Sequence, residues 1–344
     1  MRAYFLKRLL LIFPTLLGIT IVCFSIMQMV PGGPVEQAIQ KIKMAAQGEA
    51  GGGLGNDPGI QSAITEQEIE NIKKYYGFDK PVLTRYFIWL GKLIRFDLGT
   101  SYTYEKPVLQ VITSRIPISL TFGLTGLLLT YLVCIPLGIK KALNHGERYD
   151  QWSSVLIFLG YSIPAFALGV LLIVLFGGGT FLNLFPISGV VSDHFEQLSL
   201  FDKIFDCLHH MLLPLICYTI GGFATLTLLM KNSLMEQLNQ DYVRTAVAKG
   251  LSYHQAVFRH ALRNALIPIV TNIGMIISVI LSGALLIETV FTIDGMGLLG
   301  YQSIVNRDYP VALGLIVISS LLMLVGRIIS DFCLAVVDPR IKFR

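Results

Sequence analysis

The sequence predicts an all-α polytopic membrane protein with six transmembrane helices. Hydrophobic residues make up 53% of its 344 residues and charged residues only 14%, and the mean hydropathy is +0.65. These values are too apolar for a soluble domain of ordinary composition. Apolar runs long enough to cross a bilayer recur along the chain, and basic residues gather in the short loops between them. The net charge of +5 therefore indicates cytoplasmic membrane loops rather than nucleic-acid binding.

The first transmembrane helix is predicted over residues 9–30. Three basic residues precede this run, which has no small-residue cleavage site, so we expect an uncleaved helix with a cytoplasmic N-terminus. A mostly polar region, 31–115, follows and is expected to lie in the periplasm. It contains a glycine-rich piece at 48–59, most simply a flexible loop, and an acidic, helix-like piece at 65–76.

Within this region, residues 76–102 carry apolar and aromatic side chains at helical spacing with basic residues between them. This pattern is typical of an amphipathic helix at the outer membrane interface. A helix packed on the protein surface is an equal alternative.

Apolar runs predict five further transmembrane helices, at 116–139, 153–176, 208–230, 265–290 and 311–337. The loops at 140–148 and 231–264 and the C-terminal tail are basic, whereas the loop at 177–207 is mainly acidic. Because cytoplasmic loops carry the excess of Lys and Arg, both termini are predicted to be cytoplasmic. The chain thus divides into an N-terminal helix at 1–30, a periplasmic region at 31–115 and a five-helix transmembrane core at 116–344.

The loop at 231–264 contains two capped helices that meet at a glycine. Asp241 is the expected N-cap of the first helix, and Gly250 is expected to end it in the left-handed conformation. Ser252 and Gln255 have the capping-box spacing at the start of the second helix. Basic residues along the pair should hold it at the cytoplasmic surface.

The order Tyr-Val-Arg-Thr-Ala, Ala-Lys-Gly and Arg-His-Ala-Leu-Arg-Asn-Ala within 241–268 resembles the cytoplasmic loop of binding-protein-dependent ABC importer permeases, in their dipeptide and oligopeptide branch. In that family the loop supplies the coupling helix that inserts into a cleft of the ATPase subunit. The resemblance implies the fold of a type I importer permease, and two pieces of 76–102 also resemble the periplasmic segment of oligopeptide permeases. It assigns coupling to ten residues of the loop at 241–264: Tyr242, Val243, Arg244, Thr245, Ala246, Ala248, Lys249, Gly250, Arg259 and Arg263.

Two residues depart from the broad permease pattern. Arg244 stands where that pattern has a glutamate, and Arg263 stands where it has a proline. A salt bridge through that glutamate is therefore not expected here.

The resemblance implies an importer of peptides in the bacterial inner membrane. Its partners would be a second homologous permease chain, two ATP-binding domains on two chains or one fused chain, and a periplasmic peptide-binding protein. ATP and Mg²⁺ would be bound by the partner subunits, and no cofactor is expected in this chain. The overall sequence of this chain is most similar to that of Gram-negative oligopeptide permeases that also admit peptide-nucleotide antibiotics of the microcin C kind.

Two segments supply candidates for the transport pathway. A mid-span proline frees a backbone carbonyl and bends a helix, and on the residues alone this bend could equally shape a pathway or be a packing kink without a ligand. The family resemblance favours the pathway, with Tyr161, Ser162, Pro164 and Phe166 as candidates. Residues 288–310 are expected to form an outer or re-entrant hairpin. This segment resembles a family segment on the periplasmic side of the pathway, which implies that Glu288 and Asp308 could meet a peptide's amino group or its delivering protein. Alternatively, the two carboxylates cap helices and pair with Arg307.

Catalytic and metal-binding motifs are absent from the sequence. It has no GxxxxGK[ST], HExxH or GxSxG pattern, and its five cysteines are scattered. We therefore expect a non-catalytic subunit without a metal site. Arg327 and Asp331 have the spacing at which they can neutralise each other on the last helix.

Three other functions stay open on sequence grounds. An ion-coupled secondary transporter would place acidic or histidine relays within its spans, but the span centres here carry almost no carboxylates. A membrane-embedded enzyme would need a catalytic motif, and a structural scaffold would not need so ordered a cytoplasmic helix pair.

Overall fold

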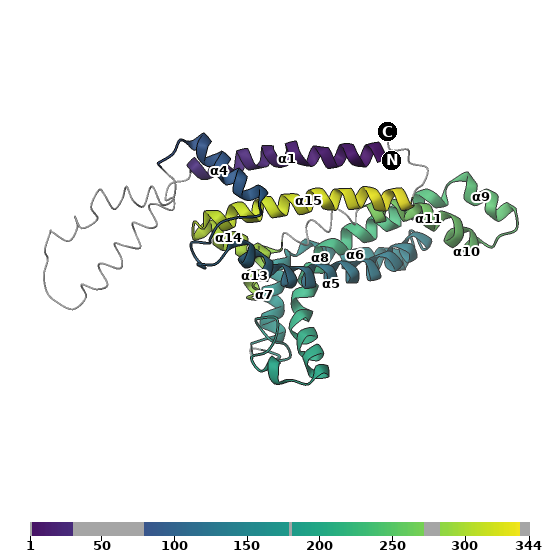
Figure 1. Cartoon of the computed structure of the whole chain (residues 1–344). Coiled ribbons are helices and arrows are strands. Elements are labelled where there is room, and N and C mark those ends of the chain that lie inside the picture. The colour runs from purple at the N-terminus through teal and green to yellow at the C-terminus, as the bar shows by residue number, and fades with distance from the viewer. Residues whose placement is uncertain (1, 30–78, 179–180, 272–282, 338–344) are drawn as a thin grey trace, which may run out of the picture. The chain divides into compact units, whose positions relative to one another are not determined.

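The computed structural model describes residues 2–29, 79–178, 181–271 and 283–337, which form helices joined by loops (Figure 1). The chain divides into two compact units, each discontinuous in sequence. The first contains Met1–Leu10, Arg115–Leu299 and Leu321–Arg344, and the second contains Leu11–Ser114 and Gly300–Ser320. The division into 1–30, 31–115 and 116–344 stays a prediction, and the pieces at 48–59 and 65–76 lie outside the described residues.

Among the described residues, four helices are long and apolar enough to cross a membrane. They are α1 (Arg2–Met29), α5 (Val108–Leu143), α8 (Leu200–Leu238) and α15 (Tyr309–Val337). A fifth span results if the bent pair α6 (Arg148–Ser162) and α7 (Ala165–Phe176) crosses as one. The remaining predicted span, 265–290, includes residues 272–282, which lie outside the described residues. The all-α membrane class is thus confirmed, while the count of six stays a prediction.

Two of the spans extend beyond their predicted bounds at both ends. The apolar runs at 116–139 and 208–230 lie inside α5 and α8 respectively. The prediction counted only the residues needed to cross the hydrocarbon layer, about 20 for a helix. Helical hydrogen bonding continues into the polar flanks, and at the start of α8 the hydroxyl of Ser199 accepts a bond from the backbone N–H of Asp202 at 3.4 Å.

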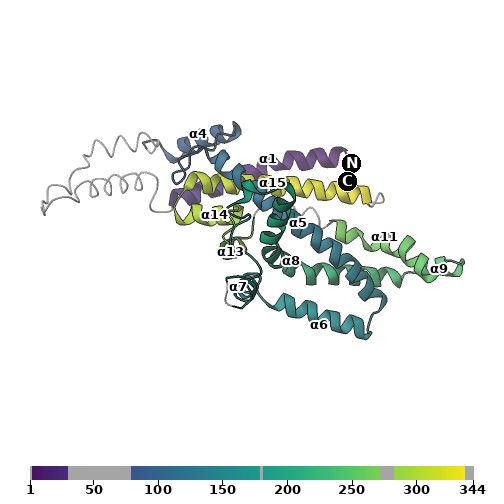
Figure 2. The same cartoon turned by 90° about the horizontal axis from the view of Figure 1, so that it is seen from below.

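The predicted bend in the third span is a complete break. α6 and α7 meet at an angle of 93° at Ile163 and Pro164, and Figure 2 shows α6 lengthwise and α7 almost end-on. Ile163 has an extended backbone, with φ −89° and ψ 122°, because a residue before proline is forced out of the helical region. Pro164 is the N-cap of α7, which begins at Ala165.

The broken span pairs with α8 along its whole length in antiparallel order. Asp150, near the start of α6, contacts Lys231 near the end of α8. Further on, a Cβ on Gly160 would meet Ile220 at 2.9 Å, and one on Gly169 would meet Cys217 at 3.4 Å. The helix α8 therefore contacts the third span on both sides of its break.

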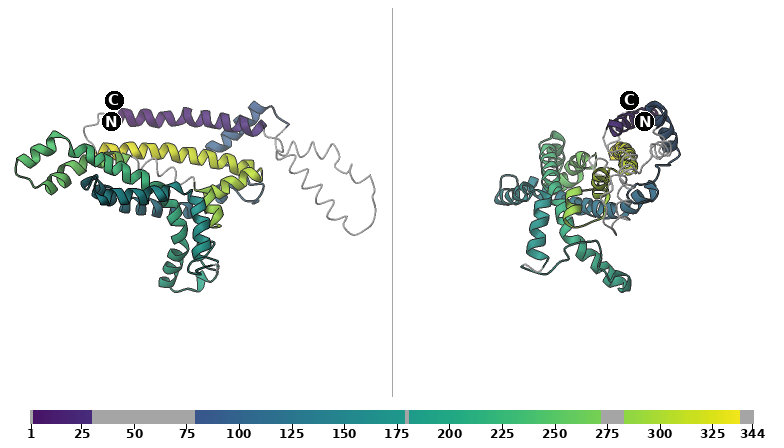
Figure 3. Two further views of the ribbon diagram at one scale, coloured as in Figure 1. Left: turned by 180° about the vertical axis from the view of Figure 1, so that it is seen from behind. Right: turned by 90° about the vertical axis from the view of Figure 1, so that its left-hand side faces the viewer.

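At the end of α8 lies a short helical segment formed by α9 (Asp241–Ala248) and α10 (Tyr253–Ala256). In Figure 3 this green segment lies beyond the end of the long helix that precedes it. It is held to the rest of the first unit by a buried apolar cluster that includes Met230 and Leu234 of α8, Val243 of α9 and Val257. α9 therefore packs directly against the end of α8.

Ion pairing joins the first and last helices within the first unit. Arg8 of α1 lies 2.5 Å from Asp331 of α15. The sequence predicted that Asp331 would be neutralised by Arg327 on its own helix, and that prediction was wrong. Arg327 is exposed, and the partner comes from the other end of the chain.

The second unit contains α4 (Val82–Ile94), which corresponds to the predicted amphipathic helix. Its Tyr86 is buried, shares a hydrogen bond of 3.1 Å with Thr20 of α1 and packs edge-on against Phe24. Leu83 and Phe87 of the same helix are exposed. Amphipathic character is confirmed, with one aromatic face packed on α1.

Candidate functional site

The first half of the predicted coupling segment is α9, which begins one residue earlier than predicted. Gln240 is the N-cap, with extended backbone angles, and Asp241 lies within the first turn. Its carboxylate there still faces the positive end of the helix dipole. The expectation that Asp241 is the N-cap was therefore wrong by one position.

Gly250 ends α9 in the left-handed conformation, as predicted. Its φ is +95°, its N–H donates to the carbonyl of Val247 at 2.9 Å, and the N–H of Leu251 donates to the carbonyl of Ala246 at 3.3 Å. These two bonds form a Schellman motif, which satisfies carbonyls that would otherwise be free at the helix end. A Cβ at Gly250 would meet no atom within 4 Å, so only the backbone conformation restricts this position.

The capping box of the second helix is also confirmed. The hydroxyl of Ser252 accepts from the N–H of Gln255, and the side chain of Gln255 accepts from the N–H of Ser252, both at 3.3 Å. After α10 the chain makes a π-helical turn, η3 (Val257–Ala261), before α11 (Leu262–Ala265). Sequence periodicity gave no sign of this wider turn.

The predicted coupling residues divide into a buried pair and an exposed set. Val243 and Ala246 are buried in the apolar cluster at the end of α8. The Tyr242 hydroxyl donates to Gln237 at 2.8 Å and accepts from Asn264 at 3.1 Å, which ties α9 to its neighbours. The other side of the segment is exposed, and the members of the predicted set on it are Tyr242, Arg244, Thr245, Ala248, Lys249, Gly250, Arg259 and Arg263.

A cavity of about 500 Å³ lies within the first unit, between α5, α8 and α13 (Leu285–Val290). Its lining is mostly apolar and rich in glycine, and it includes the rings of Tyr131 and Tyr218. A Cβ on Gly221 would meet nothing within 4 Å. The absence of a side chain at Gly221 therefore leaves open space at the α8 wall of the cavity.

The pathway candidates from the broken span do not line this cavity. Tyr161 and Phe166 are exposed, and the Ser162 hydroxyl donates to the carbonyl of Phe158 at 2.7 Å within its own helix. Pro164 makes the break itself, and the residue after it, Ala165, does contribute to the cavity. Sequence reasoning missed the glycines on α5 and α8, whose only signal is their unusual place inside long apolar helices.

Glu288 is fully buried beside the cavity. Its carboxylate accepts from the backbone N–H groups of Ala284 at 3.0 Å and Leu298 at 2.7 Å, and from the hydroxyl of Tyr218 at 3.2 Å. A Cβ on Gly295 would come within 2.6 Å of this carboxylate. These contacts correspond to the capping alternative of the sequence analysis, because the carboxylate holds together the turn between α13 and α14 (Met296–Val305).

Asp308 lies in the second unit and is also buried. Its carboxylate accepts from the hydroxyl of Ser101 and from the backbone N–H groups of Tyr102, at 3.2 Å, and Thr103, at 3.1 Å. The carbonyl of Asp308 accepts from Ala312 in the first turn of α15. Its side chain thus anchors the 101–103 loop, in addition to its predicted place at the start of the last helix.

Residues 134–343 match the family model described as binding-protein-dependent transport system inner membrane component. The chain belongs to this family. The matched residues contain the α8 and α13 walls of the cavity, the α9–α11 segment and the last span, whereas the cavity wall formed by α5 precedes residue 134. Family membership decides against the ion-coupled secondary transporter and identifies a multi-pass inner-membrane protein.

Three relatives resemble the permease over essentially their whole length. The peptidoglycan transport system permease protein YejB of Agrobacterium fabrum is 42% identical over 361 aligned positions, which cover 100% of this chain and 99% of the relative. The inner membrane ABC transporter permease protein YejB of Escherichia coli O157:H7 is 44% identical over 361 positions with the same coverage. The oligopeptide transport system permease protein AppB of Bacillus subtilis is 36% identical over 344 positions, which cover all of both chains.

Proposed function

We propose that this permease is a membrane subunit of an ATP-driven ABC importer for peptides. The observation that carries the proposal is its similarity, over the full chain, to permeases whose names specify oligopeptide or peptidoglycan transport. Peptide-nucleotides of the microcin C kind belong to the same proposed substrate range. The two YejB proteins are more similar to this chain than the oligopeptide permease is, and peptides derived from the cell wall are a natural extension of that range.

The proposed partners are a second homologous permease, two ATP-binding domains and a periplasmic peptide-binding protein. This chain then performs no catalysis and holds no cofactor, since ATP and Mg²⁺ are bound by the partner domains. Both termini are placed in the cytoplasm, on the side of the ATPases. The exposed, partly basic face of α9 supports this docking arrangement, because it leaves a capped helix end accessible to another protein.

The proposed mechanism follows from how α9 is attached. ATP-driven closure of the ATPase domains displaces α9, and the cluster around Val243 and Leu234 transmits that displacement to the end of α8. The helix α8 also forms a wall of the glycine-rich cavity. The cavity is proposed as half of the pathway, completed by the partner permease, and its apolar walls suit peptides of varied sequence.

Affinity purification of the tagged permease from its native membrane tests the partner assignment. We expect a P-loop ATPase and a second multi-span permease to copurify, and mass spectrometry identifies them. Recovery of this chain alone, after gentle extraction and with normal yield, would contradict the proposal.

Filling the cavity should block uptake without unfolding the protein. Gly221→Phe places a ring in open space, and a larger residue also improves the helix propensity of the glycine position. We expect ATP-dependent peptide uptake into vesicles to fall by about tenfold or more, equivalent to at least ~1.4 kcal/mol. Gly18→Phe on α1, which also meets no atom within 4 Å, is the matched control. Equal uptake by both variants would show that the cavity is not part of the transport pathway.

A further inference from the structure

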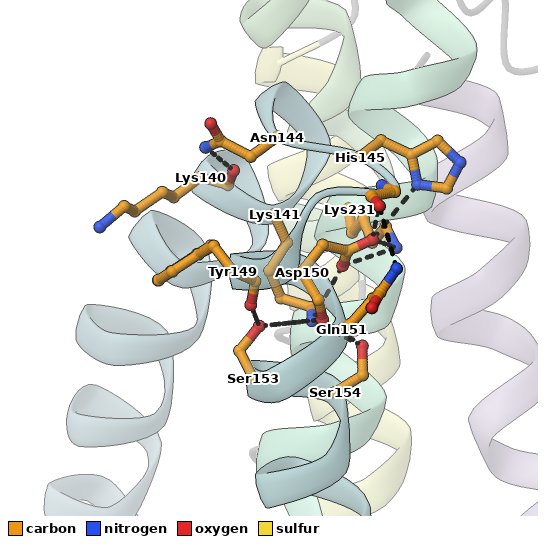
Figure 4. A network of polar contacts seen from close by, with 11 residues as sticks. Lys140, Lys141, Asn144, His145, Tyr149, Asp150, Gln151, Ser153, Ser154 and Lys231 are labelled. Atoms are coloured by element: carbon orange, nitrogen blue, oxygen red, sulfur yellow. Dashed lines mark hydrogen bonds and ion pairs between the residues drawn. The ribbon is translucent and has the colours of Figure 1, made fainter.

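A buried cluster of three charged residues joins the ends of three helices within the first unit (Figure 4). Lys141 comes from the last turn of α5, Asp150 from the first turn of α6 and Lys231 from the last third of α8. Their exposed fractions are 0%, 5% and 9%. Charged side chains this deeply buried are rare unless they are paired, and in a membrane protein they are candidates for function.

Asp150 is the centre of the cluster. Both of its carboxylate oxygens accept from the ammonium group of Lys231, at 2.8 and 2.7 Å, and one lies 3.0 Å from the ammonium group of Lys141. His145, which is exposed, lies 3.3 Å from the other oxygen. A single carboxylate thus holds two buried cations.

Lys141 fixes α5 to α6 by further bonds. Its ammonium group donates to the carbonyl of Asp150 at 2.8 Å and to the hydroxyls of Ser153, at 2.8 Å, and Ser154, at 2.7 Å. Lys231, in contrast, makes both of its bonds to the carboxylate. The link between α6 and α8 at this level therefore depends on one ion pair, while the link between α5 and α6 has independent support.

The position of this ion pair matters because of what each helix does beyond it. From Lys231, α8 runs seven residues further to its end at Leu238 and leads into α9. From Asp150, α6 runs to the break at Pro164, where it turns by 93° into α7. Separating the pair leaves an uncompensated charge in a buried site, which costs about 3–5 kcal/mol. When α8 is displaced, the start of α6 therefore moves with it. The break at Pro164 is the point at which α6 can rotate relative to α7.

We propose that the Asp150–Lys231 ion pair is the joint that transmits movement of the coupling helix to the third span. The inference rests on the proposed function of α9. Asp150 and Lys231 are then positioning residues for transport: they touch neither peptide nor ATP, and they determine how much of each ATP-driven displacement reaches the third span, whose Ala165 contributes to the cavity.

Lys231→Met is the sharpest test, because it removes only the link to α8. The variant retains the neutral pair of Lys141 and Asp150, so no net charge is left buried, and methionine fills a similar volume. In the reconstituted transporter with its ATPase, partner permease and binding protein, we expect ATP hydrolysis within about twofold of the parent and peptide uptake per ATP lowered about tenfold, the size of a typical coupling free energy.

Two matched variants separate this role from a general packing effect. Lys140→Met makes the same change one residue before Lys141, at an exposed side chain, and should retain uptake per ATP. Lys231→Arg keeps the charge and can bind the carboxylate through two nitrogens, so it should restore most of the coupling. If uptake per ATP is equal in Lys231→Met and Lys140→Met, the Asp150–Lys231 ion pair does not transmit the movement, and the proposal is contradicted. Absence of ATP-dependent uptake in the parent would instead overturn the proposed function.

A second measurement tests the joint without disturbing it. Spin labels are introduced as non-natural amino acids at Leu156 of α6 and Val174 of α7, both exposed, because the chain contains five cysteines. Electron paramagnetic resonance then measures the distance across the break, with and without ATP trapped on the assembled transporter. A change in distance supports the joint, and an unchanged distance in a transporter that hydrolyses ATP overturns it.

Discussion

Gly250→Val should abolish peptide uptake while leaving membrane insertion intact. Gly250 has a φ of +95°, a conformation that a β-branched residue adopts only with strain of about 1–3 kcal/mol. The strain is relieved by unwinding the Schellman motif, which releases the carbonyls of Ala246 and Val247 and turns α9 away from α10. Uptake in whole cells, with the amount of permease in the membrane measured in parallel, checks this result.

The control for this variant is a glycine with the same backbone requirement elsewhere. Gly99 has a φ of +82°, and a Cβ there would also meet no atom within 4 Å. Gly99→Val therefore introduces comparable strain in the second unit. Gly250→Asn should retain partial uptake, because asparagine tolerates the left-handed region. Normal uptake in Gly250→Val would remove the α9–α10 turn from the mechanism.

Gly283→Ala should prevent the permease from reaching a stable fold. Its φ is +73°, and a Cβ there would lie 2.4 Å from the backbone nitrogen of Gly297 and 2.5 Å from a carboxylate oxygen of Glu288. Neither atom can move easily, since one is backbone and the other is fixed by hydrogen bonds to Ala284, Leu298 and Tyr218. We expect the free energy of unfolding to fall by about 4 kcal/mol or more, because a clash of this kind is combined with backbone strain.

Thermal denaturation in detergent, followed by size-exclusion chromatography, measures this effect. Gly300→Ala is the control, because the nearest atom to its Cβ would be Leu315 Cδ1 at 3.9 Å and alanine favours the helix in which it lies. We expect the control to elute as the parent does and Gly283→Ala to aggregate or be degraded. A folded Gly283→Ala protein would show that the turn around Glu288 has another conformation.

Features that depend on neighbouring residues could be predicted from the sequence. The Schellman glycine at 250, the capping box at Ser252 and the break before Pro164 each depend on residue type and spacing within a few positions. The same holds for the apolar runs, whose length is set by the thickness of the bilayer.

Features that depend on residues distant in sequence could not be predicted. Asp150 and Lys231 are 81 positions apart, and nothing local to either residue indicates its partner. The same reason explains why Asp331 was assigned to Arg327 rather than to Arg8. The cavity was missed because glycines in a helix mark an opening only when the helices facing them are known.

The Arg8–Asp331 pair has a consequence for biosynthesis. Arg8 leaves the ribosome before the spans that separate the two residues, and Asp331 leaves it after them. The contact can therefore form only after every intervening span has been inserted. A chain in which α15 is missing or not inserted never makes this contact, so the pair distinguishes molecules with an inserted α15 from those without one.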